Sequence, residues 1–298
     1  MTKEYLLYDR YINIRAGALD IGGLDATFNI EKNIQQDPNK CELRVFNLSQ
    51  TNRKALQELQ NVVVEIRAGY KGLQGIKTKA DAQSINLNEL PETNKDDEFL
   101  IFSGDIVQVY SQKEGPDWIT TLRTADGAAS FQKSRFNQTY KTSKTIGDIV
   151  TELLEETSLD TTDAIKKIQE GSILGTARTV LNAHTVQGSV HRELDKKFTE
   201  LNVSGYIQDG AFVVLKQGET LGTEAVTLTP DTGLLGSPEV AQDGLLHCTS
   251  LIRPELILGH QLKLESFSTK GVYRIERIAY VGSTFSNEWY AEITASPL

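Results

Sequence analysis

Histidine and cysteine side chains are the common metal ligands and nucleophiles of proteins, so their spacing is the first test for chemistry in this chain. The sequence has four histidines, at His184, His191, His247 and His260. None stands in an HExxH motif or at metal-ligand spacing from a cysteine or carboxylate. Gly188 lies between the first two and argues against one continuous helix that would align both rings. The pattern predicts surface or hydrogen-bonded histidines and no metal site.

The two cysteines, Cys41 and Cys248, lie far apart, each inside an expected strand and without a CxxC spacing. This placement is typical of buried, reduced thiols rather than of a disulfide or a nucleophile. No other residue pattern indicates a bound cofactor, and we expect none.

One glycine-rich run has a superficial likeness to a phosphate-binding loop. GYKGLQGIKT contains Gly69, Gly72 and Gly75, but Lys77 does not follow a glycine directly and no helix-forming run comes next. The root of a flexible loop explains it better. There is no GxSxG elbow, and the acidic run at 96–98 is typical of a solvated loop end. The sequence therefore predicts a protein that is not an enzyme.

Composition excludes further classes. Of the 298 residues, 39% are hydrophobic and 24% are charged, and no run approaches the roughly 20 apolar residues of a membrane helix. We therefore expect no membrane insertion. The net charge of −9 leaves no basic excess to neutralise phosphates, which disfavours tight nucleic-acid binding. The N-terminus shows no secretory signal, so synthesis in the cytoplasm is expected.

The sequence predicts β-strands at both ends of the chain. YINIRAG, LDATFNIEKN and CELRVFNL alternate apolar and polar residues, as half-buried strands do. Ser49 stands at the N-cap position of a helix over TNRKALQELQ, and VVVEIRAGY returns to strand. Two further strands, FLIFSGDIVQVYSQ and DWITTLRTA, flank a KEGP turn. After about Glu219 the sequence again predicts a series of short strands.

The middle of the chain has a mixed pattern. Thr145 is a candidate N-cap for a helix whose apolar residues recur at helical spacing through GDIVTELLEE. A second helix is predicted over SVHRELDKKFTELN. GYIQDGAFVVLKQG then predicts a hairpin with Asp209 and Gly210 at its turn. The predicted domains are a β-barrel at 1–130, an α+β module at 131–218 and a second β-barrel at 219–298.

A polar segment at 71–98 interrupts the first predicted barrel. It shows no sustained apolar period, and its few apolar residues include Ile85, Leu87 and Leu90. Those three side chains can bury only a few kcal/mol of apolar surface. We therefore expect this segment to be either disordered or held by a partner: mobile in the isolated chain and, in an assembled ring, lying against a neighbouring subunit with Ile85, Leu87 and Leu90 as candidate interface residues.

The two strand-rich ends resemble each other. FSGDIVQVYSQKEGPDWITTLRTA begins at Phe102 and YRIERIAYVGSTFSNEWYAEITAS at Tyr273, and these numbers differ by 171. The same offset superposes Trp118 on Trp289 without a gap. The alternative is that any two hairpins of similar length overlay this well. A duplication predicts a mainly β (α+β) fold with two related, tube-like antiparallel β-barrels and an inserted mixed α+β module.

The order of the segments resembles that of a known protein family. IGGLDATFNIEKN, PNKCELRVFNLS, VVVEIRAGY, FSGDIVQV and DWITTLRTADG resemble the N-terminal half of baseplate hub proteins from contractile-tailed bacteriophages. The likeness continues through GDIVTELLEE, the GYIQDGAFVVL hairpin, TGLLGSPE and the terminal GVYRIERIAYVGSTFSNEWYAEI. It covers nearly the whole chain, and the order and spacing are more specific than any single phrase.

This resemblance implies a structural subunit of the virion tail baseplate, made in the host bacterial cytoplasm. It implies a homotrimer whose barrels form a ring beneath the tail tube, with the tail tube protein, the central spike and other baseplate proteins as partners. DNA would pass through the lumen without specific binding, and an acidic wall suits that passage. No catalytic residues carry over.

Two alternatives stay open from the residues alone. A carbohydrate-binding or adhesin-like β-protein would recognise a cell surface, but it is expected to display clustered aromatic residues, which make up only 7% of this chain. A hydrolase could assemble its site from residues that are distant in the sequence.

Overall fold

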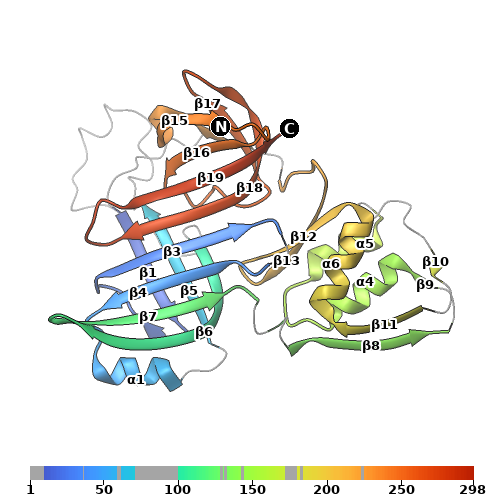
Figure 1. The fold of residues 1–298 in the computed structure, drawn as a ribbon, viewed down its shortest axis with the longest axis horizontal. Coiled ribbons are helices and arrows are strands. Elements are labelled where there is room, and N and C mark those ends of the chain that lie inside the picture. Colours follow the sequence, from blue (N-terminus) through green and yellow to red (C-terminus); the bar gives the residue numbers. More distant parts are fainter. Residues whose placement is uncertain are drawn as a thin grey trace, which may run out of the picture.

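A single antiparallel sheet dominates the molecule. The computed structural model describes residues 10–298 except 36, 59–61, 71–99, 128–129, 131–132, 142–143, 172–179, 182–183 and 223–224. Thirteen strands join in one sheet, whose main path is β15-β16-β19-β18-β3-β4-β7-β6-β5-β1-β2, with β17 and β14 branching from β18. In Figure 1 the strands from β19 to β6 lie side by side in one layer. The prediction of a mainly β fold is confirmed.

The strands of the N-terminal part and the one helix described among them have the following bounds: β1 (Arg10–Ala16), β2 (Leu19–Asp20), β3 (Ala26–Asn33), β4 (Lys40–Phe46), α1 (Gln50–Glu58), β5 (Val63–Tyr70), β6 (Leu100–Glu114) and β7 (Asp117–Ala125). Apolar and polar residues alternate along these strands, and the alternation determines which face of each strand is buried. In β3, Phe28 and Ile30 are buried while Asn29 and Glu31 are exposed. The backbone N–H of Asn52 donates to the Ser49 hydroxyl at 3.2 Å, so Ser49 caps α1 as predicted.

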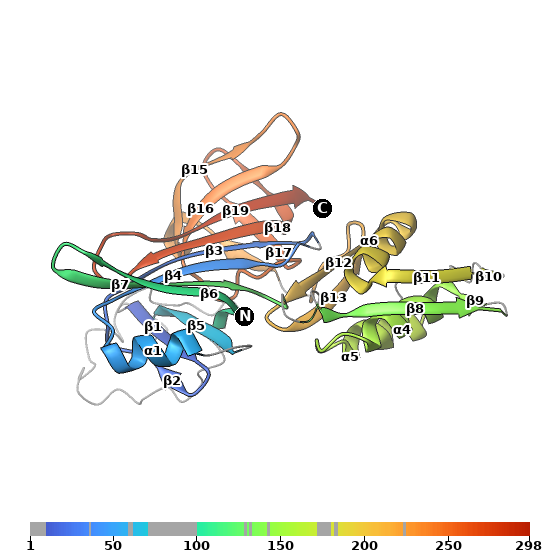
Figure 2. The same cartoon turned by 60° about the horizontal axis from the view of Figure 1, so that its bottom comes forward.

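The middle part has its own hydrophobic core. Its elements are β8 (Arg135–Tyr140), β9 (Lys144–Thr145), α4 (Ile146–Glu155), α5 (Thr162–Gln169), β10 (Val180–Leu181), β11 (His184–Ser189), α6 (Val190–Leu201), β12 (Val203–Gln208) and β13 (Ala211–Lys216). Thr145 caps α4 in a capping box with Asp148, and Asp209 and Gly210 both have positive φ in the β12–β13 turn. The predicted helices and hairpin are confirmed, whereas α5 was not predicted. Figure 2 shows this part beside one end of the sheet.

The C-terminal strands repeat the order of the N-terminal ones. They are β14 (Val226–Leu228), β15 (Leu234–Val240), β16 (Leu246–Leu251), β17 (Gln261–Glu265), β18 (Lys270–Ser283) and β19 (Trp289–Pro297), with a 3₁₀ turn at Pro230–Thr232. Neighbouring strands in space run β15-β16-β19-β18-β17, and the earlier set runs β3-β4-β7-β6-β5. Both sets therefore have the same order in the chain and the same order in the sheet.

One joint connects the two sets of strands. Residues 277–283 of β18 pair antiparallel with residues 27–33 of β3. Gly282 pairs with Phe28 there, and a Cβ at Gly282 would overlap the Phe28 ring. Glycine at this position is what lets the Phe28 ring lie against the β18 backbone.

Candidate functional site

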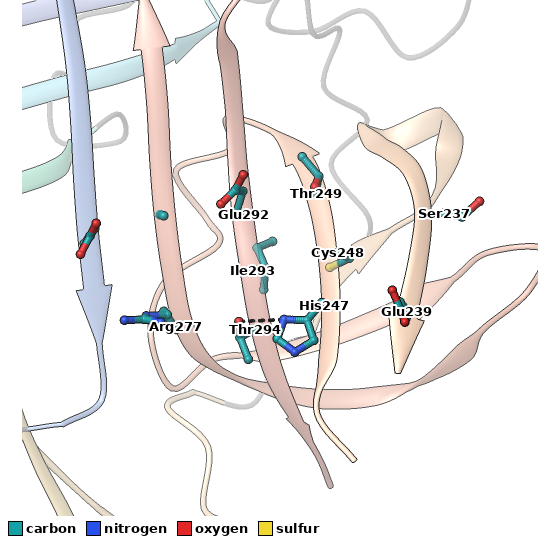
Figure 3. A pocket seen from close by; sticks show the side chains of 11 residues that line it. Ser237, Glu239, His247, Cys248, Thr249, Arg277, Glu292, Ile293 and Thr294 are labelled. Carbon is teal, nitrogen blue, oxygen red and sulfur yellow. Dashed lines mark hydrogen bonds between the residues drawn. The ribbon is translucent and has the colours of Figure 1, made fainter. Parts of the chain in front are cut away.

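One hollow in the described structure lies on the polar face of the sheet. It has a volume of about 530 Å³ and spans β3, β18, β19, β16 and β15. Figure 3 shows its side chains spread over these strands, with one hydrogen bond drawn, 3.3 Å between the His247 Nδ1 and the Thr294 hydroxyl. No group of three or more His, Cys, Asp or Glu side chains among the described residues is arranged to hold a metal ion.

The residues singled out for chemistry do not converge. His184 lies in β11, His191 in α6 and His247 in β16, so the first two belong to different elements on either side of Gly188. Cys41 and Cys248 are free and buried, and burial raises the pKa of each thiol to about 12. Both thiols therefore stay protonated and unreactive at neutral pH.

Several predicted residues fall outside the described part of the chain. These include the candidate interface residues Ile85, Leu87 and Leu90, the glycine-rich run beyond Tyr70 and the acidic run at 96–98. Their predicted role stays a prediction. In the described part, no helix is long and apolar enough to cross a membrane.

The two tryptophans occupy matching places in two long hairpins. Trp118 on β7 pairs with Lys113 on β6, and Trp289 on β19 pairs with Gly282 on β18. Each first strand has a bulge, at Val107 in β6 and at Glu276 in β18. These bulge positions differ by 169, whereas the tryptophans differ by 171. The second hairpin therefore has a turn two residues longer, which the ungapped sequence match missed.

The surroundings of the two tryptophans differ. Trp289 is 2% exposed and packs edge-on against Phe28, with 5.8 Å between ring centroids. Trp118 is 39% exposed, and the Arg53 guanidinium of α1 lies 4.0 Å from its ring centroid. The buried ring lies where the two strand sets meet, and the exposed ring lies near a strand edge that has no such neighbour.

That strand edge belongs to β6. Residues 100–105 of β6 pair with β5, but residues 107–114 have a ladder partner only on the β7 side within the described structure. At one end of the sheet, β15 pairs with β16 alone. An open edge of this kind accepts another strand.

A buried polar cluster fastens the β12–β13 hairpin to the sheet. Asp126 accepts hydrogen bonds from the backbone N–H groups of Asp209 and Gly210 at 2.6 and 2.9 Å. The Lys32 ammonium donates to both Asp209 carboxylate oxygens at 2.7 and 2.8 Å. The Asn39 amide donates to the Ile207 carbonyl oxygen at 2.7 Å. The cluster couples the middle module to β3 and to the end of β7.

A family model decides where this chain belongs. The model described as Baseplate hub gp41 matches residues 13–295. The chain belongs to this baseplate hub family. Among curated protein sequences, none matches the chain. The family assignment confirms the resemblance that the sequence indicated.

Solved structures show the same fold as this baseplate hub protein. A tail protein from Neisseria meningitidis MC58 has a TM-score of 0.59 and 10% identity, over 97% of this chain and 96% of that chain. The 43 kDa tail protein of prophage MuSo2 from Shewanella oneidensis has a TM-score of 0.60 and 9% identity, over 97% of each chain. An E. coli protein, c3393, described as a type VI secretion component with structural similarity to T4 bacteriophage tail proteins gp27 and gp5, has a TM-score of 0.54 and 10% identity, over 96% of this chain and 76% of that chain.

The polar cluster makes the stability of this baseplate hub protein depend on pH. Burial, followed by repulsion from Asp209, raises the pKa of Asp126 from 3.8 to about 7. Between these values the folded state keeps a proton that the unfolded state has lost, so this group's contribution to the free energy of unfolding falls as pH rises from about 4 to about 7. Three pKa units correspond to at most about 4 kcal/mol.

The comparison to make is urea unfolding of the wild type and Asp126→Asn at several pH values from 4 to 8. The wild-type minus variant difference in unfolding free energy should decrease with rising pH and level off above about 7. Subtracting the variant removes the contributions of all other carboxyl groups. A difference that does not change with pH would refute the assignment.

Proposed function

We propose that this chain is a structural, non-enzymatic subunit of the baseplate hub of a contractile phage tail, and that three copies form a ring. The observation that carries the proposal is the repeated set of five strands within one chain. A trimer of such chains presents six similar units, which matches the symmetry of a hexameric tube above it.

The repeat also supports the domain division. We propose two tube-like antiparallel β-barrels, within 1–130 and 219–298, with the α+β module of 131–218 between them. The matching strand order, the matching bulges in β6 and β18 and the matching places of Trp118 and Trp289 favour a duplication over chance likeness of two hairpins.

The proposed ring joins the tail tube to the central spike and to other baseplate proteins. The fold shared with phage tail proteins, and with a type VI secretion component likened to T4 gp27 and gp5, supports these partners. A chain with a net charge of −9 suits a ring through which DNA passes without binding, because acidic surfaces repel phosphate. Its place is the virion tail baseplate.

The non-enzymatic assignment rests on chemistry as well as on family. Among the described residues no group of His, Cys, Asp or Glu side chains is arranged to hold a metal ion, and burial keeps both thiols protonated. Ring formation, not turnover, is the property to measure.

Light scattering on the purified chain tests the proposal. A trimer of the 33.0 kDa chain has a mass of about 99 kDa. We expect that mass at micromolar concentration, with threefold rings in particle images. A monomer at every concentration up to the solubility limit, with no rings in the images, would refute the trimer.

A further inference from the structure

We infer that the hollow on the polar face of the C-terminal strands is a binding site for an arginine side chain presented by a partner protein. The site is formed within one chain, so the inference does not depend on ring formation. At its centre Ala279 of β18 faces Glu292 of β19 on one side and Glu31 of β3 on the other. Carboxylates from two strands therefore flank a residue whose side chain is a single methyl group.

The repeated strand sets provide an internal comparison for this hollow. The two tryptophans fix the correspondence of β7 with β19, and the ladders extend it to the neighbouring strands. At three positions on the polar face, a large side chain of the first set corresponds to a small one of the second. These pairs are Arg44 and Thr249, Tyr110 and Ala279, and Arg123 and Thr294. The three small residues all line the hollow, so the hollow lies where the first set has two guanidinium groups and a ring.

In the first set the arginines at these positions are paired with carboxylates. Arg123 Nε lies 3.1 Å from a carboxylate oxygen of Glu42, and Arg44 Nη2 lies 3.3 Å from one of Glu114. The Arg123 guanidinium also lies 5.9 Å from the ring centroid of Tyr110. This strand arrangement therefore holds carboxylate–guanidinium pairs on its polar face when the chain itself supplies the arginines.

In the second set the carboxylates are present without those arginines. Glu31, Glu239 and Glu292 line the hollow, and none of them has an ion pair among the residues that the structure describes. Arg277 also lines it, but in Figure 3 its guanidinium points toward β3 and away from Glu292. Three carboxylates outnumber this one arginine, so the hollow has a net negative charge at neutral pH.

An arginine fits this charge and spacing better than other cations do. Glu31 and Glu292 lie two strands apart, which separates their backbones by roughly 10 Å. The planar guanidinium has donors on several sides, so one group placed above Ala279 can bind a carboxylate on each side. A metal ion is not favoured, because no group of His, Cys, Asp or Glu side chains in the described part of the chain is arranged to hold one. The phosphates of a nucleic acid would be repelled.

The charge of the chain favours a different protein as the source of the arginine. With a net charge of −9, a second copy is repelled as it approaches an acidic surface, whereas a basic segment of another protein is attracted. Ion pairs between exposed side chains are individually weak and are screened by salt. Binding to this hollow should therefore weaken as the salt concentration rises.

Fluorescence anisotropy with a dye-labelled Gly-Arg-Gly-Arg-Gly peptide tests the site. In an extended peptide both arginines point to the same side. We expect the wild-type chain to bind this peptide at low salt, and Glu292→Gln to weaken binding by about tenfold or more. The matched control is Glu58→Gln, an exposed carboxylate on α1 with the same change of net charge, which should bind as the wild type does. Replacing both arginines of the peptide by lysines should weaken binding, because an ammonium does not bridge two carboxylates as a guanidinium does.

Two further substitutions place side chains of the first set in the hollow. Thr249→Arg supplies an arginine directly opposite Glu292, and Ala279→Tyr fills the space without a change of charge. Both should reduce peptide binding by about tenfold or more. Val272→Tyr, at an exposed valine of β18 outside the hollow, is the control for the added ring and should bind as the wild type does. Circular dichroism checks folding, and Glu292→Gln, which keeps the shape of its side chain, decides the outcome if a larger substitution does not fold.

Several results would overturn the site: no binding by the wild-type chain, equal losses in Glu292→Gln and Glu58→Gln, or unchanged binding by folded Ala279→Tyr. Light scattering on Glu292→Gln separates the two sources of the arginine. The variant should have the same mass as the wild type. A smaller assembly would show that a second copy occupies the hollow and would overturn the assignment to a partner protein. A monomeric wild type that binds the peptide would refute the proposed ring and leave this site standing.

Discussion

Trp289→Ala should lower the free energy of unfolding by about 3–5 kcal/mol, the range for truncating a fully buried aromatic side chain. Trp289 is 2% exposed, packs against Phe28, and pairs with Gly282 on the strand that joins the two strand sets. The substitution leaves a cavity at this joint, and the backbone on both sides is held by sheet hydrogen bonds that limit collapse. Urea unfolding followed by circular dichroism measures the effect.

Trp118→Ala is the matched control, because Trp118 has the same place in the other hairpin. It should cost only about 1 kcal/mol, from a partly exposed ring and one cation–π contact with Arg53. The two tryptophans have the same place in their hairpins. The difference between the two losses in unfolding free energy therefore measures the effect of the tertiary surroundings. Equal losses in the two variants would show that the joint is not where stability is concentrated.

Lys32→Met should destabilise the fold at neutral pH by about 3–5 kcal/mol, the usual result of removing one partner of a buried ion pair. Lys32 is 2% exposed and donates to both carboxylate oxygens of Asp209. Methionine keeps most of the volume but leaves the carboxylates of Asp209 and Asp126 close together without a cation. Unfolding in urea at pH 7 and at pH 5 measures the change.

The loss caused by Lys32→Met should be smaller at pH 5, since protonation of Asp126 relieves the repulsion. Adding Asp126→Asn should recover part of the stability at pH 7, because one charge of the carboxylate pair is removed. The double variant thus measures the coupling between the two sites. A loss from Lys32→Met that is the same at both pH values and in the Asp126→Asn background would show that packing, and not charge, holds Lys32 in place.

Local patterns in the sequence predicted the elements whose physics is local. Thr145 followed by Asp148 predicts a capped helix start because both groups lie within one turn, and α4 begins there. Asp209 and Gly210 predict a tight hairpin because both tolerate positive φ, and both have it. Alternation of apolar and polar residues predicts the buried and exposed faces of β3, because successive side chains of a strand point to opposite sides of the sheet. The helix α5 was not predicted because it is short and its few apolar residues are flanked by polar ones.

The sequence alone determined the family, the mainly β class and the correspondence of Trp118 with Trp289, because each depends on the order and period of residues along the chain. Only the tertiary structure decided the register of the hairpins, the different burial of the two tryptophans and the pairing of β18 with β3, which joins residues about 250 positions apart. The cluster of Lys32, Asp126 and Asp209 was equally hidden. Such contacts depend on which distant surfaces meet, and neither period nor propensity along the chain carries that information.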